Sequence, residues 1–435
     1  MTNHSVTLST KISYGIGALG KDFVWALTNT FLMFYFTDVA DISPAFIGAI
    51  FLIARVLDAF TDPIMGIIVD NTRSRFGKFR PWILIGTIVN SIFVVGLFLT
   101  HEISQEWKYA YAAVMYIMWG LTYTIMDIPF WSMISSLTTS RKQREKLVVW
   151  PRLFATIAGA LIGTYGLKTV GFFGGDDMGT GFAYLSVICV ITFLISSLVT
   201  FWKVKPVVEI PLDAEKLNIR DILSVFKLND QLRIFIGFVA IFGIGNNFIG
   251  GFNIYYTTQL LERPDLFANM SLIGAFCGPA GVLLFPHISN WLPRKNIWYV
   301  IASTPAVFSV LLFMAYIFEQ ENIYFLGLAS AVVSFGGGLF GALAIVLLGD
   351  IIDYGEKASG QRTESIIFST FTMLTKATGA ISAFMVGMGL SFSNYVPDTE
   401  ISAFTADTFR WMIMLPPLLL MLSSAFIYKR FYQLK

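Results

Sequence analysis

Twelve apolar segments alternate with short polar links along the 435 residues of the chain. A helix needs about twenty residues to cross the hydrocarbon core of a bilayer. Apolar segments of this length lie near residues 12–37, 45–69, 81–100, 108–136, 150–170, 181–202, 232–260, 268–288, 297–317, 323–349, 363–391 and 409–431. A helix pairs its backbone N–H and C=O groups within one segment, which is necessary because lipid offers them no hydrogen-bond partner. The pattern therefore predicts an all-α integral membrane protein with twelve transmembrane helices.

The longest polar link divides these segments into six and six. It covers residues 203–231, so we predict an N-terminal six-helix bundle at 1–202, a cytoplasmic linker at 203–231 and a C-terminal six-helix bundle at 232–435. A weak internal repeat supports two related halves, because residues 66–78 and 286–295 both end in basic residues. In transporters built from such repeats the substrate lies near the bilayer midplane, between the halves.

Basic residues mark every second link. They are abundant at 73–80, 141–146, 294–295 and 429–430, whereas the other links are acidic. Because short cytoplasmic loops carry an excess of Lys and Arg, we predict that both termini are cytoplasmic. The first ten residues are polar and lack the apolar core and cleavage site of a signal peptide, so we expect the first helix to remain in the membrane.

Composition excludes several classes of function. Hydrophobic residues make up 55% of the chain and charged residues 13%, about half the charged share of a soluble domain. The net charge is +2 and the basic residues lie in short links, so no nucleic-acid partner is expected. The two cysteines, Cys189 and Cys277, lie in apolar segments and predict neither disulfides nor a metal site. No nucleotide-binding motif is found, and we expect neither an enzyme nor a cofactor.

Several ionisable residues lie inside the apolar segments. An ionisable side chain at this depth costs about 2.5–3.5 kcal/mol on insertion scales, so each one is a candidate for a functional site. The candidates that lie on the first, second, fourth, fifth and eleventh segments are Lys21, Asp22, Arg55, Asp58, Asp62, Asp127, Arg152 and Lys376.

Two of these acids predict a cation site. Asp58 and Asp62 are four residues apart, so both carboxylates project from one helix face. The two carboxylates can serve as ligands of a Na⁺ ion. Because their like charges repel each other, one of them can bind a proton in place of the ion. Thr61 can add a hydroxyl ligand. A bound monovalent cation leaves one negative charge, which Lys376 can neutralise. Alternatively, the acids form a purely structural cluster with Arg55 and Lys376.

A second group has the chemistry of a sugar site. Asp22 and Asp127 can each accept strong hydrogen bonds from hydroxyl groups. Trp131, four residues after Asp127, offers a flat apolar face, and Arg152 can donate through its forked guanidinium. The alternative interpretations are that Lys21 and Asp22 merely neutralise each other and that Trp131 is an ordinary packing residue.

A third group predicts gating contacts. Asp350, Asp353, Glu356 and Arg362 follow the tenth segment, and we expect them to form ion pairs between the halves that close the cytoplasmic side. Arg141 is chiefly an orientation determinant, with gating as a second role.

Four long motifs of the first half resemble a known family. They read SYGIGALGKDF at 13–23, RVLDAFTDPIMG at 55–66, GKFRPWILIG at 77–86 and WGLTYTIMDIPFW at 119–131. The second half matches mainly at NDQ (229–231), DYGE (353–356) and Lys376. At these residues the chain resembles the glycoside–pentoside–hexuronide:cation symporters of the major facilitator superfamily. The resemblance implies a major facilitator fold.

The resemblance also implies roles for the candidate residues. Those implied to bind or adjoin a galactoside are Lys21, Asp22, Tyr123, Thr124, Asp127, Trp131 and Arg152. Asp58 and Asp62 would bind the coupling Na⁺, Li⁺ or H⁺, with Thr61, Thr124 and Lys376 near them. The family's asparagine in the cation motif is Thr61 here, and Gly341 and Asn29 replace two aromatic residues near the expected second sugar. The preferred ion and sugar therefore stay open.

We therefore predict a secondary active symporter for an α-galactoside such as melibiose in a bacterial inner membrane, with lipid as its surroundings and a monomeric state. A different glycoside, such as a β-glucoside, xyloside or glucuronide, is the closest alternative. For a glucuronide, Arg152 and Lys21 could supply positive charge. A lysolipid carrier or a sugar sensor on the same fold is the alternative from another class.

Overall fold

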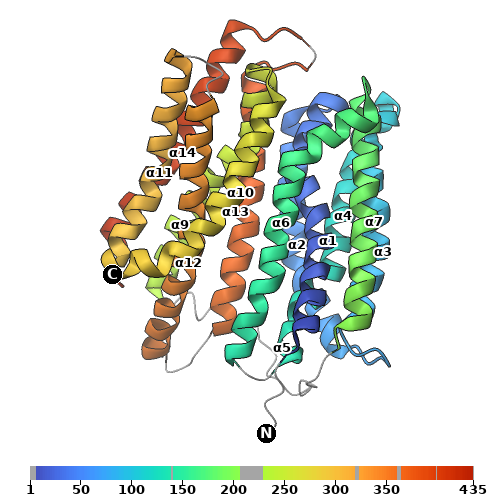
Figure 1. The fold of residues 1–435 in the computed structure, drawn as a ribbon, viewed down its shortest axis with the longest axis vertical. Helices are drawn as coiled ribbons and strands as arrows, with labels where there is room; N and C mark the ends of the chain where they lie inside the picture. Colours follow the sequence, from blue (N-terminus) through green and yellow to red (C-terminus); the bar gives the residue numbers. More distant parts are fainter. Residues whose placement is uncertain are drawn as a thin grey trace. The chain divides into compact units, whose positions relative to one another are not determined.

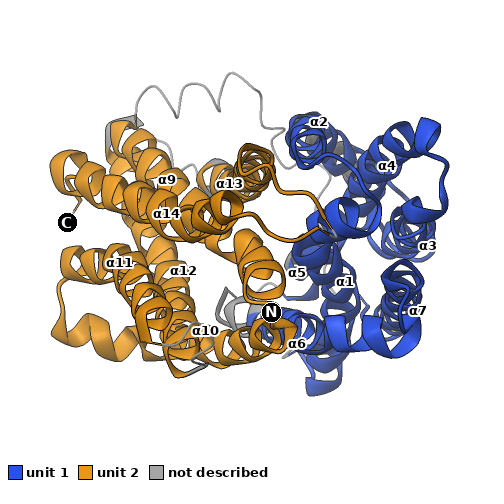
Figure 2. Cartoon of the chain, turned by 90° about the horizontal axis from the view of Figure 1, so that it is seen from above, with its two compact units in different colours: residues 1–214 blue, residues 215–435 orange. Residues whose placement is uncertain are grey.

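The computed structural model describes residues 6–138, 141–205, 229–318, 323–359, 364–397 and 399–434. The chain forms two compact units, residues 1–214 and 215–435 (Figure 2). Their boundary lies within the predicted linker, of which residues 206–228 are outside the described residues.

The described residues form twelve long helices and no strand, which confirms the all-α prediction (Figure 1). The long helices of the first unit are α1 (Leu8–Phe34), α2 (Pro44–Asn71), α3 (Arg80–Leu97), α4 (Gln105–Ser132), α6 (Arg141–Gly174) and α7 (Met178–Lys203), with a short α5 (Ile134–Leu137). Those of the second unit are α9 (Asp230–Tyr255), α10 (Pro264–Trp291), α11 (Arg294–Phe318), α12 (Ile323–Ser359), α13 (Glu364–Phe392) and α14 (Ala403–Phe431).

Ten of these helices are long and apolar enough to cross a membrane. The other two are α1 and α4, which carry Lys21, Asp22 and Asp127 together with several Gly, Thr and Tyr residues. The two long helices of the described residues that fall short of this length and composition are thus the ones that hold Lys21, Asp22 and Asp127 of the predicted sugar site.

Two predicted boundaries are wrong. Helix α6 begins at Arg141 rather than near residue 150, and α12 continues to Ser359 rather than ending near 349. The basic residues 141–146 and the acidic residues 350–356 are therefore helical, not parts of links. The reason is that an apolar segment ends where the bilayer ends, while the helix continues through charged residues such as Arg, Lys and Glu that favour helices in water.

Helix α1 is held in the first unit by glycines. It packs against α6 and α7, and a Cβ atom on Gly17 or Gly20 would come within 2.0 Å of the Thr200 hydroxyl or 1.8 Å of the Ser196 hydroxyl. Small residues let the backbones of membrane helices approach closely. This contact fixes the rotation of α1 about its axis and thereby the direction in which Lys21 and Asp22 point.

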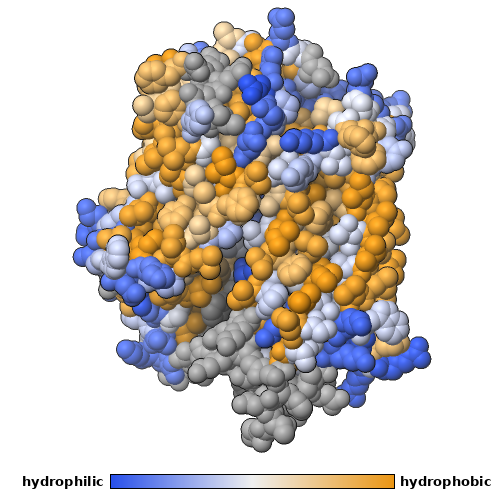
Figure 3. All heavy atoms as spheres, viewed as in Figure 1, coloured by the Kyte–Doolittle hydropathy of each residue, from blue (hydrophilic) through white to orange (hydrophobic). Residues whose placement is uncertain are grey.

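The outer face of α7 is apolar. Its exposed large side chains recur at helical spacing at Tyr184, Val187, Ile188, Ile191, Ile195 and Leu198. Small polar residues such as Ser196, Ser197 and Thr200 are buried instead. Figure 3 shows apolar atoms along the helix flanks and hydrophilic atoms gathered at the helix ends. This arrangement is expected of helices that are surrounded by lipid.

The same turn occurs at corresponding places of the two units. Helix α1 ends in a π-helical turn, Tyr35–Val39, and α9 ends in another, Tyr256–Leu260. Each is followed by an acidic residue with positive φ, Asp41 at 54° and Glu262 at 53°. The next helices, α2 and α10, both begin with proline. The internal repeat is thus clearer in the backbone here than in the sequence motifs.

Candidate functional site

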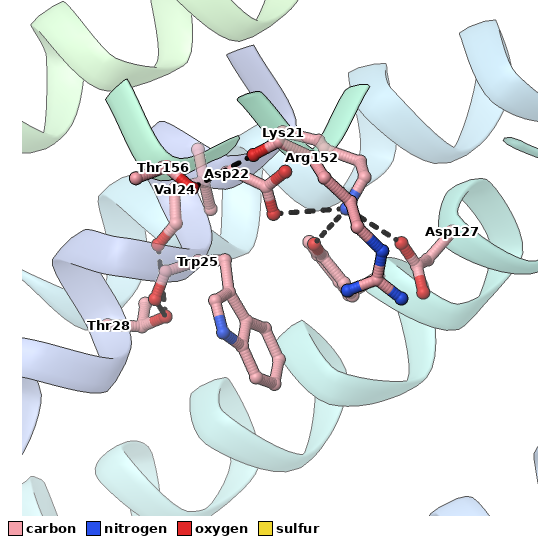
Figure 4. A network of polar contacts seen from close by, with 9 residues as sticks. Lys21, Asp22, Val24, Trp25, Thr28, Asp127, Arg152 and Thr156 are labelled. Atoms are coloured by element: carbon pink, nitrogen blue, oxygen red, sulfur yellow. Dashed lines mark hydrogen bonds and ion pairs between the residues drawn. The ribbon is translucent and has the colours of Figure 1, made fainter. Parts of the chain in front are cut away.

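Lys21 joins two carboxylates from different helices. Its Nζ lies 3.0 Å from Oδ1 of Asp22 on α1 and 3.1 Å from Oδ1 of Asp127 on α4 (Figure 4). It also donates a hydrogen bond to the Tyr123 hydroxyl, at 3.5 Å. The Lys21 side chain is only 4% exposed, so its charge depends on these partners rather than on water. The sequence-predicted residues Asp22 and Asp127 therefore lie at one site.

This cluster has acceptor capacity to spare. Oδ2 of Asp22 is buried and has no hydrogen-bond partner among the described residues. Buried polar atoms in native proteins nearly always have a partner. The Asp22 oxygen therefore retains the capacity to accept a hydrogen bond, for example from a ligand hydroxyl.

Arg152 balances the charge of the cluster. One lysine and two aspartates leave a charge of −1, and Arg152 is close enough to act electrostatically on Asp22. Its side chain is exposed, points toward the same space as Asp22 and Asp127 (Figure 4), and forms no ion pair within the described residues. With its guanidinium the four groups sum to zero. Such a site suits a polar ligand without net charge.

Aromatic rings surround the lysine. Nζ of Lys21 lies 5.1 Å from the ring centre of Trp131, 5.6 Å from that of Phe130 and 5.9 Å from that of Tyr123. A cation at this range is attracted to an aromatic face. The Tyr14 hydroxyl donates to the Phe130 carbonyl at 2.5 Å, and the two rings stack. Trp131 therefore lies beside the cluster as predicted, while Tyr14 and Phe130 were not foreseen.

The predicted cation residues lie between α2 and α4. Asp58 Oδ1 is 3.7 Å from the position that a Cβ atom of Gly120 would take. One turn further, the Thr124 hydroxyl donates to Asp62 Oδ1 at 2.9 Å. Both carboxylates thus face α4, and their four-residue spacing had predicted that they project from one face of α2. The Thr61 hydroxyl donates to the Leu57 carbonyl of its own helix at 3.1 Å.

Arg55 is the positive partner of this pair. Its guanidinium donates to Asp58 Oδ2 at 2.7 Å, and it interacts with the Tyr116 hydroxyl. In the described residues no third His, Cys, Asp or Glu completes a metal-binding group with Asp58 and Asp62. Any further ligands for a monovalent cation would therefore be neutral oxygens, such as the Thr124 hydroxyl.

Trp25 lies between the two clusters. Its ring centre is 5.4 Å from that of Tyr123, 6.0 Å from that of Trp119 and 5.9 Å from the Arg55 guanidinium. Tyr123 in turn contacts Lys21. Trp25 was not among the residues predicted from the sequence, although it lies three and four residues after Asp22 and Lys21 and therefore on the same side of α1.

The remaining predicted residues lie outside the two clusters on α1, α2 and α4. Asp350 forms an ion pair with Arg294 of the same unit. Asp353 and Glu356 lie on α12, and Lys376 lies on α13. Arg141 is the first residue of α6, and Arg362 lies outside the described residues. The predicted contacts of these residues between the two halves stay predictions.

Comparison with solved structures identifies the fold. A bacterial homologue of the lysosomal transporter Spinster aligns with a TM-score of 0.69 and 13% identity, covering 97% of this chain and 95% of that one. A D-xylose–proton symporter aligns with a TM-score of 0.66 and 16% identity, covering 98% of both chains. Both likenesses concern the fold alone.

Sequence comparison identifies the family. The inner membrane symporter YicJ of Escherichia coli is 31% identical over 100% of this chain and 94% of its own length. The putative glycoside/cation symporter YagG of the same organism is 30% identical over 91% of this chain and 85% of its own length. The raffinose carrier protein of Pediococcus pentosaceus is 27% identical over 91% of this chain and 64% of its own length. The family described as MFS/sugar transport protein matches residues 13–435. The chain therefore belongs to this family, as its resemblance to the glycoside–pentoside–hexuronide:cation symporters of the major facilitator superfamily predicted.

Proposed function

We propose that this protein couples the uptake of a glycoside, an α-galactoside such as melibiose, to the entry of Na⁺, Li⁺ or H⁺. The observation that carries the proposal is that Asp22 and Asp127, from two helices, share Lys21 and leave a buried acceptor oxygen. Carboxylates placed in this way can accept hydrogen bonds from several hydroxyls of one sugar ring. A lipid carrier would have no use for such a site.

In this proposal the first unit binds the sugar in three ways. Asp22 and Asp127 accept hydroxyl hydrogen bonds, while Lys21 and Arg152 donate to ring or hydroxyl oxygens. Trp131 stacks on the C–H face of the ring. Thr124 and Tyr123 complete the site from α4.

The coupling cation binds Asp58 and Asp62, with Thr124 as a neutral oxygen ligand and Thr61 as a further candidate. Coupling follows from α4, because Thr124 contacts Asp62 and Asp127 lies three residues further along the same helix. An ion that orders Thr124 also orders Asp127 and raises sugar affinity. Lys376 neutralises the remaining charge, and ion pairs of Asp350, Asp353, Glu356, Arg362 and Arg141 close the cytoplasmic side.

An anionic glycoside such as a glucuronide is a second candidate. It is favoured by the exposed Arg152 guanidinium, which has no carboxylate partner in the described part of the chain. A relative from Salmonella typhimurium, 27% identical, carries the name putative sulfoquinovose importer. In either case the protein acts in a bacterial inner membrane as a monomer, with both termini in the cytoplasm.

The test is binding and counterflow with purified protein in vesicles, with and without Na⁺ and across pH. We expect Na⁺ or H⁺ to raise melibiose affinity and melibiose to raise ion affinity by the same factor, as linkage requires. Thr124→Val should weaken ion binding about tenfold, since a hydrogen bond to a charged group contributes about 1.5 kcal/mol, whereas Thr124→Ser should not. If no glycoside exchanges, or if neither ion changes its affinity, the proposal is wrong.

A further inference from the structure

Asn90 is a buried amide near the middle of the apolar helix α3. Its side chain is 0% exposed. Its Nδ2 donates to the Trp119 carbonyl at 2.8 Å and to the Thr122 hydroxyl at 2.9 Å, both on α4. Helices α3 and α4 lie side by side in the first unit (Figure 2). Because a buried amide is costly unless it forms such hydrogen bonds, Asn90 holds the two helices in one register.

Both donor protons of the Asn90 amide are used in this contact. A carbonyl can only accept a hydrogen bond, so the atom that faces the Trp119 carbonyl must be Nδ2 and not Oδ1. The Thr122 hydroxyl donates its own proton to the Met118 carbonyl of α4 at 2.7 Å, so its oxygen accepts from Asn90. Oδ1 of Asn90 is buried and has no hydrogen-bond partner in the part of the chain that the structure describes. The contact therefore requires a side chain that donates two protons, which a hydroxyl or a carboxylate does not.

Helix α4 turns two different faces toward its neighbours. The face toward α3 carries residues at spacings of three and four, and these are Trp119, Thr122 and Met126. The candidate site uses the next face, whose residues at spacings of four, three and four are Gly120, Thr124, Asp127 and Trp131. A rotation of α4 about its axis would move the residues of this second face together. Asn90 opposes such a rotation from the first face.

The contact formed by Asn90 lies at the level of the predicted cation residues. The residues of α4 that it holds are within 119–122, and Thr124 follows in the same helical turn. The Thr124 hydroxyl donates to Oδ1 of Asp62 at 2.9 Å. Asp127 lies nearly one turn further and has its own ion pair with α1. Asn90 is therefore better placed to set the geometry of the ion site than that of the sugar site.

We propose that Asn90 is a positioning residue for the coupling cation: by holding residues 119–122 of α4, it sets where the Thr124 hydroxyl meets Asp62. This inference rests on the proposed function. Asn90 itself does not touch the ion. Without its hydrogen bonds α4 is no longer fixed at this level, so the Thr124 hydroxyl and the Asp62 carboxylate no longer converge on one ion. The amide thus controls ion affinity from a helix that contributes no ligand.

The experiment titrates purified protein with Na⁺ by calorimetry without sugar, so it tests the inference whichever glycoside is transported. Asn90→Leu removes both hydrogen bonds at similar side-chain size. It should weaken Na⁺ binding about fivefold, as expected for the net loss of about one hydrogen bond. Melibiose affinity without Na⁺ should change less than about twofold, because the sugar residues are held separately. If protons and not Na⁺ act on the wild type, the pH of half-maximal melibiose affinity replaces Na⁺ affinity.

Thr87→Val is the matched control. Thr87 is also 0% exposed and lies one turn before Asn90 on α3, but its hydroxyl pairs with that of Ser197 on α7 at 2.9 Å. Thr87→Val should lower the thermal midpoint about as much as Asn90→Leu does and leave ion affinity unchanged. If Asn90→Leu fails to fold, Thr122→Val removes only one of the two acceptors and should still weaken ion binding more than Thr122→Ser does.

A double variant tests the route of the effect. Adding Asn90→Leu to Thr124→Val should weaken ion binding less than about twofold further, because both substitutions act on the same ligand. A full additional loss would show that Asn90 acts by another route and would refute the inference.

The remaining outcomes separate the inference from the proposed function. If the wild type responds to the ion while Asn90→Leu and Thr87→Val have equal ion affinities, Asn90 only stabilises the fold and the inference alone is refuted. If the wild type responds to neither Na⁺ nor pH, the proposed function fails together with the inference.

Discussion

At the scale of residues, the contacts of Lys21 bear on two interpretations that the sequence left open. Its pairing with Asp22 was either a local neutralisation or part of a ligand site. The structure shows that the pairing is more than local, because the same ammonium group lies 3.0 Å from Asp22 on its own helix and 3.1 Å from Asp127 on α4. The ion pair with Asp22 positions the Lys21 ammonium group on α1. The ion pair with Asp127 joins this group to α4, so the three side chains form one cluster between the two helices.

This arrangement predicts the effect of removing the lysine. Lys21→Met leaves Asp22 and Asp127 close together and without their cation, and breaking such a buried pair costs about 3 kcal/mol. We expect a lower midpoint of thermal unfolding and no glycoside binding. The double variant Lys21→Met with Asp127→Asn removes the uncompensated charge, so it should recover most of the stability without recovering binding. A Lys21→Met protein as stable as the wild type would show that the ion pair is not structural.

The candidate site was predictable only where its residues were chemically unexpected. Four acidic residues were found because an acidic side chain in an apolar segment is costly and therefore indicates a functional site; they are Asp22, Asp58, Asp62 and Asp127. Trp25, Tyr116 and Trp119 were not, because aromatic residues are common in membrane helices. Their importance lies in which ring contacts which, and that depends on the rotation of α1 and α4 about their axes. Glycine contacts fix this rotation, and helical periodicity alone does not give it.

At the scale of helices, close packing positions the site from a distance. A Cβ atom on Gly86 of α3 would lie 2.7 Å from the backbone nitrogen of Met126 on α4. Backbone cannot move aside as a flexible side chain can, so α4 itself must shift. Met126 directly precedes Asp127, so the packing of α3 against α4 affects the position of that carboxylate.

Gly86→Ala should therefore weaken glycoside binding severalfold, although residue 86 is not expected to contact the ligand. Gly159→Ala is the matched control, since nothing lies within 4 Å of its Cβ position on α6. The control should bind normally. It should be more stable by about 0.5–1 kcal/mol, because alanine loses less backbone conformational entropy on folding than glycine does. Equal effects of the two substitutions on binding would contradict this role of α3. Titration calorimetry and thermal unfolding measure both quantities.

The start of α7 predicts a dependence on pH. Asp177 caps the helix, and its pKa is held below the usual range mainly by the hydrogen bond from the Thr180 hydroxyl, with backbone N–H groups adding to it. A lowered pKa in the folded state adds stability above the unfolded pKa of about 3.9, and this stability is lost as the pH falls through the folded value.

Asp177→Ala should thus lower the thermal midpoint at neutral pH, and the difference from wild type should shrink below about pH 4. Asp177→Asn keeps a capping side chain without a titrating charge, so its stability difference should follow a different pH profile from that of the alanine variant. A difference between alanine variant and wild type that is independent of pH would exclude a charged cap. Thermal unfolding in detergent over pH 3–7 gives the comparison.

At this scale the existence of each helix was predictable and the ends of two were not. Apolar length reports where lipid ends, so α6 and α12 extend into sequence that hydropathy alone assigns to links. The π-helical turns at Tyr35–Val39 and Tyr256–Leu260 were likewise not predicted. Neither turn has a sequence signal comparable to a proline or a glycine, so this part of the repeat was recognised in the backbone.

At the scale of the whole molecule, the distribution of basic residues predicts how the chain crosses the membrane. After replacement of Cys189 and Cys277, a single cysteine at Glu102 should react with a membrane-impermeant maleimide in intact cells. A cysteine at Arg75 should react only after the cells are permeabilised, because the basic link lies inside. The reverse pattern would place both termini outside and overturn the predicted orientation.

The low hydrophobicity of α1 and α4 also bears on how the protein is made. Helix α1 carries Lys21 and Asp22, and it is not among the helices apolar enough to span a membrane. Its second carboxylate partner, Asp127, is translated about a hundred residues later. We therefore expect α1 to become stable in the bilayer only once α4 has been made and Lys21 can pair with Asp127.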